Sequence, residues 1–160
     1  MKNIWTLILP VTVVLLISCG NEKEIKRDIL KHNNTLENTN PVIYFEIPVT
    51  DIKRAKQFYA AVFGFTFEDE VIDGNTMALF PFSKQKTGIS GALAKGDIYK
   101  PTTKGILVYF ATQDIDATLN AALQNGAKVL YPKTSNGDLG YVAEFQDTEG
   151  NRIALHQAVD

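Results

Sequence analysis

The stretch YFEIPVTD, residues 44–51, joins an extended apolar run to an aspartate that begins a helical pattern, and LVYFATQD, residues 107–114, does the same later in the chain. After each aspartate, apolar residues recur at helical spacing until a glycine interrupts them, at Gly64 and at Gly126. Aspartate is a favoured N-cap and glycine a favoured residue at a helix C-terminus. The sequence therefore predicts one strand–helix unit that occurs twice.

Three short strand candidates follow each predicted helix: residues 65–71, 75–82 and 89–94 after the first, and 128–133, 141–146 and 152–158 after the second. The Asp-Gly pair at 73–74 is typical of a hairpin turn. The order is thus βαβββ, repeated in tandem. This order predicts an α+β fold with the helices on one face of the sheets.

Alternation along the predicted strands assigns their side chains to two faces. In the first strand, the odd-numbered residues of 43–49 are apolar and should pack against the helix. In the repeat, the even-numbered residues of 106–110 should do so. The polar residues that this alternation places on the opposite, ligand-binding face are Tyr44, Glu46, Tyr109, Glu144 and His156. Phe80 and Phe82 are further candidates for this face.

The N-terminal 18 residues have a basic start and an apolar run, the pattern of a secretory signal. The run ends in LISC, residues 16–19, which resembles a bacterial lipobox and implies cleavage before Cys19 and lipidation of its thiol. The alternative is an uncleaved anchor. Cys19 is the only cysteine, so no intrachain disulfide can form. We expect an exported protein, lipid-anchored to the cell envelope, and Gly20 after the cysteine favours the outer membrane.

Residues 19–40 are charged and asparagine-rich, which predicts a flexible tether behind the lipidated cysteine. Residues 41–160 are long enough for one compact domain. The net charge of −2 and the absence of a basic block argue against nucleic acid as a partner.

Two stretches, IPVTDIKRAKQFYAAVFGF (47–65) and DTEGNRIALH (147–156), together with the duplicated βαβββ plan, resemble the vicinal-oxygen-chelate superfamily. That superfamily includes glyoxalase I, extradiol dioxygenases, and bleomycin- and fosfomycin-resistance proteins. The resemblance covers residues 41–160 and is greatest to glyoxalase-like bacterial members. It implies a curled mixed sheet with a cup-shaped cavity, closed within one chain or across a homodimer.

The resemblance places the family's metal ligands at Tyr44, near Ala78, and at Leu107 and Ala154. Alanine and leucine offer no donor atom, and a neutral tyrosine is a poor ligand for a divalent ion. We therefore expect no metal site and no cofactor. A second scheme, with a divalent metal held by Glu46, Glu144 and His156, stays open.

Three functions follow from these observations. The first is a binding protein whose cup holds a small organic molecule, as resistance-type members of the superfamily do. The second is a lyase, isomerase or dioxygenase that uses an unplaced metal, or Glu46 or Glu144 as a general base with His156 as its partner. The third is a module that docks an envelope partner on its sheet face.

Overall fold

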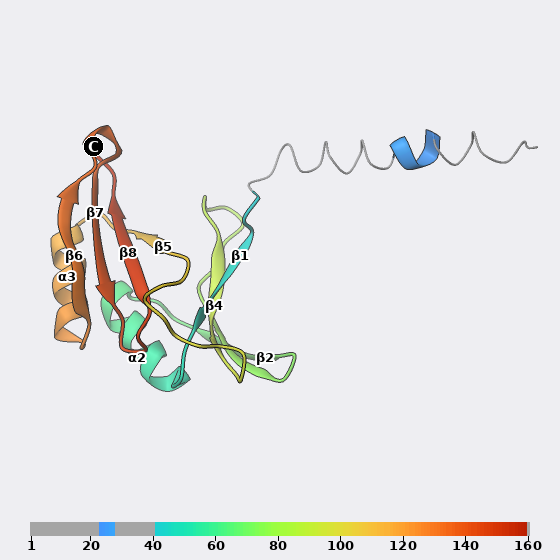
Figure 1. Cartoon of the computed structure of the whole chain (residues 1–160), viewed down its shortest axis with the longest axis horizontal. Helices are drawn as coiled ribbons and strands as arrows, with labels where there is room; N and C mark the ends of the chain where they lie inside the picture. The colour runs from blue at the N-terminus through green and yellow to red at the C-terminus, as the bar shows by residue number, and fades with distance from the viewer. Residues whose placement is uncertain (1–22, 28–40, 160) are drawn as a thin grey trace, which may run out of the picture. The chain divides into compact units, whose positions relative to one another are not determined.

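The computed structural model describes residues 23–27 and 41–159 (Figure 1). Residues 23–27 are helical and exposed. The predicted signal sequence, Cys19 and most of the predicted tether lie outside the described residues. Within the described part of the chain, neither α-helix of the domain nor the segment 23–27 has the length and apolar character needed to cross a membrane.

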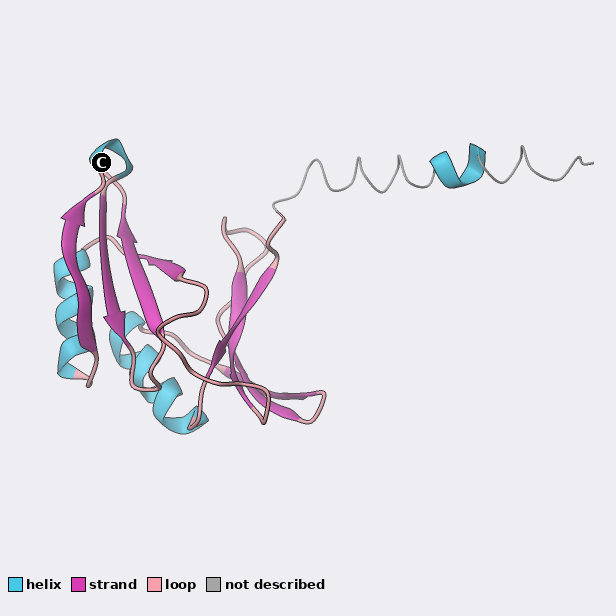
Figure 2. Ribbon diagram, viewed as in Figure 1, coloured by secondary structure: helices cyan, strands magenta, loops and turns pink. Residues whose placement is uncertain are grey.

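From Val42 onward the chain forms one compact unit that contains two βαβββ modules. The first module consists of β1 (Tyr44–Pro48), α2 (Ile52–Phe63), β2 (Glu68–Ile72), β3 (Asn75–Leu79) and β4 (Ser90–Lys95). The second consists of β5 (Val108–Ala111), α3 (Ile115–Gln124), β6 (Lys128–Ser135), the 3-10 turn η1 (Gly137–Leu139), β7 (Tyr141–Gln146) and β8 (Arg152–Gln157). The predicted α+β fold with two tandem modules is confirmed (Figure 2).

Each module builds one four-stranded mixed sheet. Sheet A has the strand order β1-β4-β3-β2, and sheet B has the equivalent order β5-β8-β7-β6. In both sheets the first strand pairs in parallel with the last, and the other pairs are antiparallel. The two modules therefore share one topology, as a duplicated sequence requires.

The helix boundaries follow the predicted caps. The Asp51 carboxylate accepts hydrogen bonds from the backbone N–H groups of Lys53 and Arg54 at 3.0 and 3.1 Å, and the helix ends at Gly64. In the repeat, the Asp114 carboxylate accepts from the Ala117 N–H at 3.0 Å. These caps satisfy N–H groups that have no partner within the helix, which explains why both helices begin where the sequence predicts.

One aromatic core joins the two modules. Phe58 of α2 packs against Phe145 of β7, with ring centroids 5.9 Å apart, and Phe45 of β1 packs against Phe110 of β5 at 6.1 Å. Tyr59 is completely buried among them. The helix-facing sides of both sheets thus contribute to a single core, and α2 and α3 contact each other. The opposite sides of the two sheets do not take part in this core.

Alternation failed at the first apolar residue of each predicted edge strand. Ile43 is 80% exposed and Ile106 is 94% exposed, although both were expected to pack on a helix. Each precedes the first paired residue of its strand, so no ladder fixes its direction. The predicted strand over 75–82 is also too long, because Pro81 has no N–H to donate to a ladder.

The turn between β7 and β8, residues 147–151, links the second module to the first. The Glu149 carboxylate accepts hydrogen bonds from the backbone N–H groups of Thr50 and Asp51 at 2.8 and 3.0 Å and forms an ion pair with Arg54 at 2.7 Å. Burial alone would raise the pKa of Glu149, but these hydrogen bonds outweigh it and lower the pKa from its ordinary value. A residue of the second module therefore supplements the N-terminal cap of α2.

The Asp147 side chain accepts hydrogen bonds from the backbone of this turn. One carboxylate oxygen accepts hydrogen bonds from the backbone N–H groups of Glu149, Gly150 and Asn151 at 2.8–2.9 Å. The other accepts from the Tyr59 hydroxyl at 2.9 Å. Burial of Asp147 raises its pKa despite these hydrogen bonds. The Asn151 side chain also donates to the Pro48 carbonyl at 2.8 Å, so the turn holds both α2 and the end of β1.

Candidate functional site

The faces of sheets A and B that point away from the helices, here called the outer faces, carry equivalent rows of side chains. In sheet A the strand register aligns Glu46, Ala92, Leu79 and Glu68. In sheet B it aligns Tyr109, Ala154, Glu144 and Tyr131. Each row has a polar residue at both edges and an alanine on the strand next to the first edge. The two modules therefore share the same arrangement of outer-face positions but differ in the side chains that occupy them.

One end of the outer face of sheet A is covered by the linker between the modules. Tyr99 of this linker packs against Met77, Ala92 and Ala94, which are at most 1% exposed. Its hydroxyl donates a hydrogen bond to the Glu46 carboxylate at 2.7 Å, which raises the pKa of Tyr99 to about 12. The linker therefore fills this end of the face and fixes Glu46.

The other end of this face opens into a cavity of about 660 Å³, here called the aromatic pocket. Side chains from all four strands of sheet A and the adjoining segments line it, including Tyr44, Phe67, Glu68, Leu79, Phe82 and Ser90. Pockets for drug-sized molecules have about this volume and are mostly apolar with a few polar groups. The aromatic pocket has this composition.

The walls of the aromatic pocket differ in how deeply their side chains are buried. Phe80 is 6% exposed and packs against Phe67 with ring centroids 5.2 Å apart, so this wall is held by the core. Phe82 and Tyr44, at 66% and 44% exposed, form the rim. Burial and, secondarily, the Glu46 charge raise the pKa of Tyr44, which keeps its hydroxyl neutral. A fixed floor and exposed aromatic rings at the rim can enclose a guest molecule.

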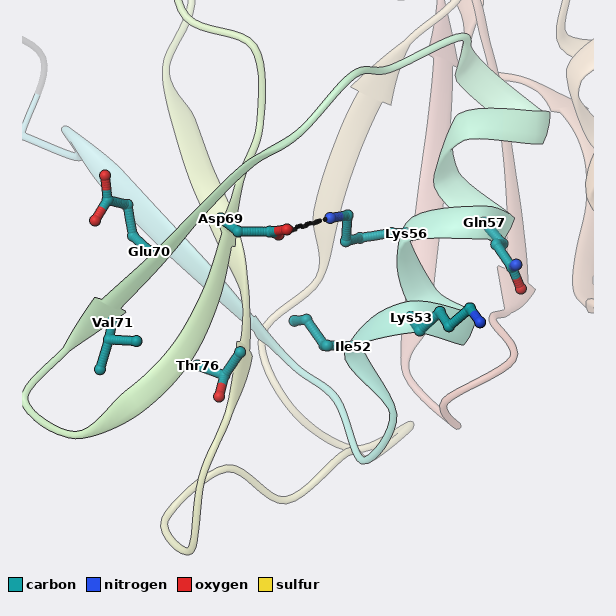
Figure 3. Close-up of a pocket in the computed structure, with 8 residues that line it drawn as sticks. All are labelled: Ile52, Lys53, Lys56, Gln57, Asp69, Glu70, Val71 and Thr76. Carbon is teal, nitrogen blue, oxygen red and sulfur yellow. Dashed lines mark hydrogen bonds and ion pairs between the residues drawn. The ribbon is translucent and has the colours of Figure 1, made fainter.

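A second cavity, of about 730 Å³, lies between α2 and β2 on the helix side of sheet A (Figure 3). Lys56 reaches across it to Asp69 and forms an ion pair at 2.6 Å. Lys53, Gln57 and Glu70 also border this groove, but their side chains point away from its centre in Figure 3. An ion pair spans the opening, so this groove is a weaker candidate than the aromatic pocket.

The outer face of sheet B holds its polar groups in internal pairs. Glu144 is 8% exposed and is paired with Arg152, whose Nε lies 2.5 Å from the carboxylate. His156 Nε2 lies 2.6 Å from the Leu139 carbonyl oxygen. Tyr109 is 52% exposed. The two charged groups therefore neutralise each other and the histidine is hydrogen-bonded to backbone.

The structure divides the five predicted site residues between two faces. Tyr44 and Glu46 lie on sheet A, whereas Tyr109, Glu144 and His156 lie on sheet B. Of the five, Tyr44 lines the aromatic pocket. A cup that unites both sets, and the homodimer that could close it, stay predictions.

Sequence reasoning missed three residues that shape the aromatic pocket and the adjoining face. Phe67 was assigned to a strand that begins only at Glu68, and Glu68 itself received no role. Tyr99 lies in the linker, where no periodicity indicates which way a side chain points. The positions of these three residues depend on tertiary contacts. Phe80 and Phe82, in contrast, were already candidates from the sequence, and both line the pocket.

The residues at the family's metal positions do not fit a divalent ion. Ala78 is buried in the core on the helix side, and the outer-face residues beside it are Met77 and Leu79. Ala154 and Leu107 offer no donor atom. Within residues 23–27 and 41–159, no three His, Cys, Asp or Glu side chains lie close enough together to hold a metal ion.

The residues of the second metal scheme and of the proposed acid–base pairs are each hydrogen-bonded to another group of the protein. Glu46 is held by Tyr99, Glu144 by Arg152, and His156 by the Leu139 carbonyl. A role for Glu46 or Glu144 together with His156 on a common ligand therefore stays a prediction. Arg152 forms its ion pair with Glu144 of the same sheet.

Known proteins share both the sequence and the fold. The sequence model of the Glyoxalase/Bleomycin resistance protein/Dioxygenase superfamily matches residues 42–155. A glyoxylase-like domain-containing protein of Didymella fabae is 33% identical over 123 residues, which cover 69% of this chain and 88% of that protein. The putative glyoxylase CFP32 of Mycobacterium bovis is 25% identical over 117 residues, or 72% of this chain. The match spans only 44% of CFP32.

Solved structures give the same result. A glyoxylase/bleomycin resistance protein/dioxygenase domain from Frankia sp. EAN1pec superposes with a TM-score of 0.60 at 14% identity, covering 76% of this chain and 100% of that one. TnmS3, an antibiotic binding protein from Streptomyces sp. CB03234, superposes with a TM-score of 0.54 at 26% identity, covering 76% and 98%. The duplicated βαβββ fold, the family match and the Didymella relative agree: this chain belongs to the Glyoxalase/Bleomycin resistance protein/Dioxygenase superfamily.

Proposed function

We propose that this chain is a lipid-anchored protein of the cell envelope that binds a small organic molecule in the aromatic pocket, without a metal ion or another cofactor. The observation that carries the proposal is the pocket itself. It combines a volume of about 660 Å³, a buried aromatic floor and exposed aromatic side chains at its rim. Such cavities bind ligands by removing apolar surface from water, with few polar groups to orient them.

Two further observations support a binding role. The two outer-face carboxylates that were predicted as site residues are hydrogen-bonded within the protein, Glu46 to Tyr99 and Glu144 to Arg152. A general base must instead be free to reach a substrate proton. TnmS3, which is similar to this chain over most of its length, is an antibiotic binding protein. A receptor or sequestering protein fits this arrangement better than an enzyme.

Metal analysis tests the cofactor part of the proposal. The full chain, purified without chelator in detergent and incubated with Zn²⁺, Ni²⁺, Fe²⁺ and Mn²⁺, should retain far less than one metal per chain by elemental analysis. About one tightly held metal per chain would overturn this part. Glu46→Gln and His156→Ala would then show whether the outer faces hold it.

The binding part is tested with Phe82→Ala. Phe82 is largely exposed, so its removal should leave thermal stability unchanged while it weakens any pocket ligand. The full chain would be screened against a library of small organic molecules by thermal shift, and each hit titrated calorimetrically against wild type, Phe82→Ala and the control Lys84→Ala from the same loop. Hits that bind Phe82→Ala as tightly as wild type would contradict the assigned pocket.

The anchor is tested at Cys19. Cells that express the full chain should show it in the membrane fraction with incorporated fatty acid, whereas Cys19→Ala should lose the label. A protein that carries no lipid in wild-type form would contradict the anchor and leave the pocket proposal unaffected. Fractionation of inner and outer membranes in the same cells tests the expected outer-membrane location.

A further inference from the structure

The outer face of sheet A carries an excess of negative charge. Glu46, Glu68 and Glu70 lie on this face, since each is aligned with an outer-face residue of the neighbouring strand. Figure 3 shows the Glu70 side chain pointing away from the helix-side groove. Among the described residues that line the aromatic pocket, Glu68 is charged and none is a lysine or arginine. The charge that these lining residues supply is therefore negative and favours a cation over an anion.

The Ser90 hydroxyl at the pocket also favours a ligand that donates a hydrogen bond. Ser90 lines the pocket, and its hydroxyl donates to the backbone carbonyls of Phe80 and Pro81, 3.2 and 3.1 Å away. Because a hydroxyl has one hydrogen and two lone pairs, Ser90 Oγ is left as an acceptor. Glu68 is likewise an acceptor when ionised. Glu68 and Ser90 thus offer acceptors to a ligand that brings hydrogen-bond donors, and the Tyr44 and Thr66 hydroxyls of the lining can accept as well as donate.

The aromatic walls suit the same ligand. Tyr44, Phe67 and Phe82 present rings from three segments of the chain, and apolar Leu79 and Pro81 lie between them. Flat aromatic molecules stack on such rings, and a cation gains additional energy from the ring faces. An anion would meet Glu68 without a basic partner, and it would lose its hydration shell without compensation.

We infer that the ligand of the aromatic pocket is a planar aromatic molecule that carries a protonated amine. This inference rests on the proposed binding function and specifies its ligand class. The ring system lies between Phe67 and the rim residues Tyr44 and Phe82, and the ammonium group faces the Glu68 carboxylate and Ser90 Oγ. The amine must be the donor in both contacts, since both protein groups accept.

Three anthracene derivatives that share one ring system and differ in charge test the inference. At pH 7, 9-(aminomethyl)anthracene is a cation, 9-anthracenemethanol is neutral and 9-anthracenecarboxylate is an anion. The full chain in neutral detergent would be titrated calorimetrically with each. We expect the cation to bind about tenfold more tightly than the neutral probe and the anion to bind most weakly. The preference for the cation should decrease at high salt.

Matched variants identify the residue that causes the preference for the cationic probe. Glu68→Gln should weaken the cation about fivefold and leave the neutral probe unchanged, because it removes the charge and keeps the shape. Glu70→Gln, on the same face and strand but outside the pocket, should change neither. Phe82→Ala should weaken all three probes.

The outcomes separate this inference from the proposed function. Equal affinity for all three probes, with loss of binding in Phe82→Ala, would overturn the cationic class and keep the aromatic pocket as a binding site. Tighter binding of the anion, or an unchanged charge preference in Glu68→Gln, would overturn it as well. Failure of all three probes overturns the ligand class, and the library screen with Phe82→Ala then decides the proposed function.

Discussion

The two loops that the duplication makes equivalent have opposite roles. The loop between β7 and β8, residues 147–151, is a short turn, and its Asp147, Glu149 and Asn151 side chains are hydrogen-bonded to the first module at the end of β1 and the start and middle of α2. The loop between β3 and β4, residues 80–89, is longer and carries the exposed Phe82 at the rim of the aromatic pocket. One copy of the loop holds the modules together, and the other copy shapes a binding site.

The difference shows how a duplicated fold can divide stability and function between its halves. A turn held by many buried hydrogen bonds is costly to alter, whereas an exposed loop tolerates substitution and can adapt to a ligand. The helices show the same division. The N-terminus of α2 is capped from the second module by Glu149, but the backbone N–H of Ile115 in α3 donates to Gln157 of its own module. The second module therefore supports the first, which carries the pocket.

The largest expected effect is that of Asp147→Ala. This change removes the side-chain acceptor of three backbone N–H groups and of the buried Tyr59 hydroxyl. The Gly150 N–H keeps its hydrogen bond to the Asp147 backbone carbonyl, whereas the N–H groups of Glu149 and Asn151 and the hydroxyl lose their acceptor. We expect a loss of about 3–5 kcal/mol in the free energy of unfolding, measured by urea denaturation. The exposed change Phe82→Ala in the equivalent loop should cost less than about 0.5 kcal/mol.

Conservative variants distinguish hydrogen bonding from charge at Asp147. Asp147→Asn keeps an oxygen for the backbone N–H groups but turns an amide donor toward Tyr59, so it should be intermediate. Tyr59→Phe should lose about 1 kcal/mol. Wild-type stability in Asp147→Ala would show that the turn does not join the modules and would remove the contrast between the two loops.

The next effect is the pH dependence at Glu149. The folded state lowers the pKa of Glu149 from its ordinary value of 4.5, so its contribution to stability is present above pH 4.5 and is lost as the pH falls through the folded pKa. Glu149→Gln should therefore be less stable than wild type at pH 7, by about 2 kcal/mol, and the gap should narrow toward pH 3. Urea denaturation at pH 3, 5 and 7 measures this gap.

The stability contributed by Asp147 should change with pH in the opposite direction to that contributed by Glu149. Burial raises its pKa above the ordinary value of 3.8, so the fold favours the protonated form. The pH-dependent term of its contribution is therefore most favourable below pH 3.8 and is lost as the pH rises through the folded pKa. This term is separate from the hydrogen bonds that Asp147→Ala removes. Asp147→Asn should remove this term and leave the Glu149 term in place. Parallel pH profiles for the two variants would contradict the assignment of opposite shifts to the two carboxylates.

Local signals in the sequence were sufficient for the architecture. Asp51 and Asp114 predicted both helix starts, because an N-cap acts through backbone groups within three residues. The range of β7 was also predicted correctly at both ends, 141–146. Alternation failed where no neighbouring strand fixes a residue, as at Ile43. Local chemistry therefore determined the elements and their order.

The site required information that local patterns do not hold. Alternation placed Tyr44 and Glu46 on the outer face, but the partner of Glu46 is Tyr99, 53 residues away, and the linker that carries Tyr99 has no periodic pattern. Likewise, Glu149 acts on Thr50, 99 residues away. Contacts of this separation depend on how the modules pack, so the sequence indicated candidate polar residues without indicating which of them meet.

The smallest expected effect compares the rigidity of the two equivalent loops. Each loop contains a glycine in the same backbone conformation. Gly88 and Gly150 have φ angles of +99° and +101°, a region that L-residues rarely adopt. An added Cβ meets nothing within 4 Å at Gly88, whereas at Gly150 it lies 3.8 Å from Gln146 and 3.9 Å from Pro101. Neither contact is a clash, so any difference in cost between the two sites reports how far each backbone can relax.

We expect Gly150→Ala to lose about 1–2 kcal/mol in the free energy of unfolding, because three hydrogen bonds to Asp147 hold its turn in place. Gly88→Ala should lose less than about 1 kcal/mol, since the longer loop can shift to a permitted φ. Urea denaturation of both variants gives the two values. Equal losses would mean that the loop over 80–89 is as rigid as the 147–151 turn, and the rim of the aromatic pocket would then be preformed.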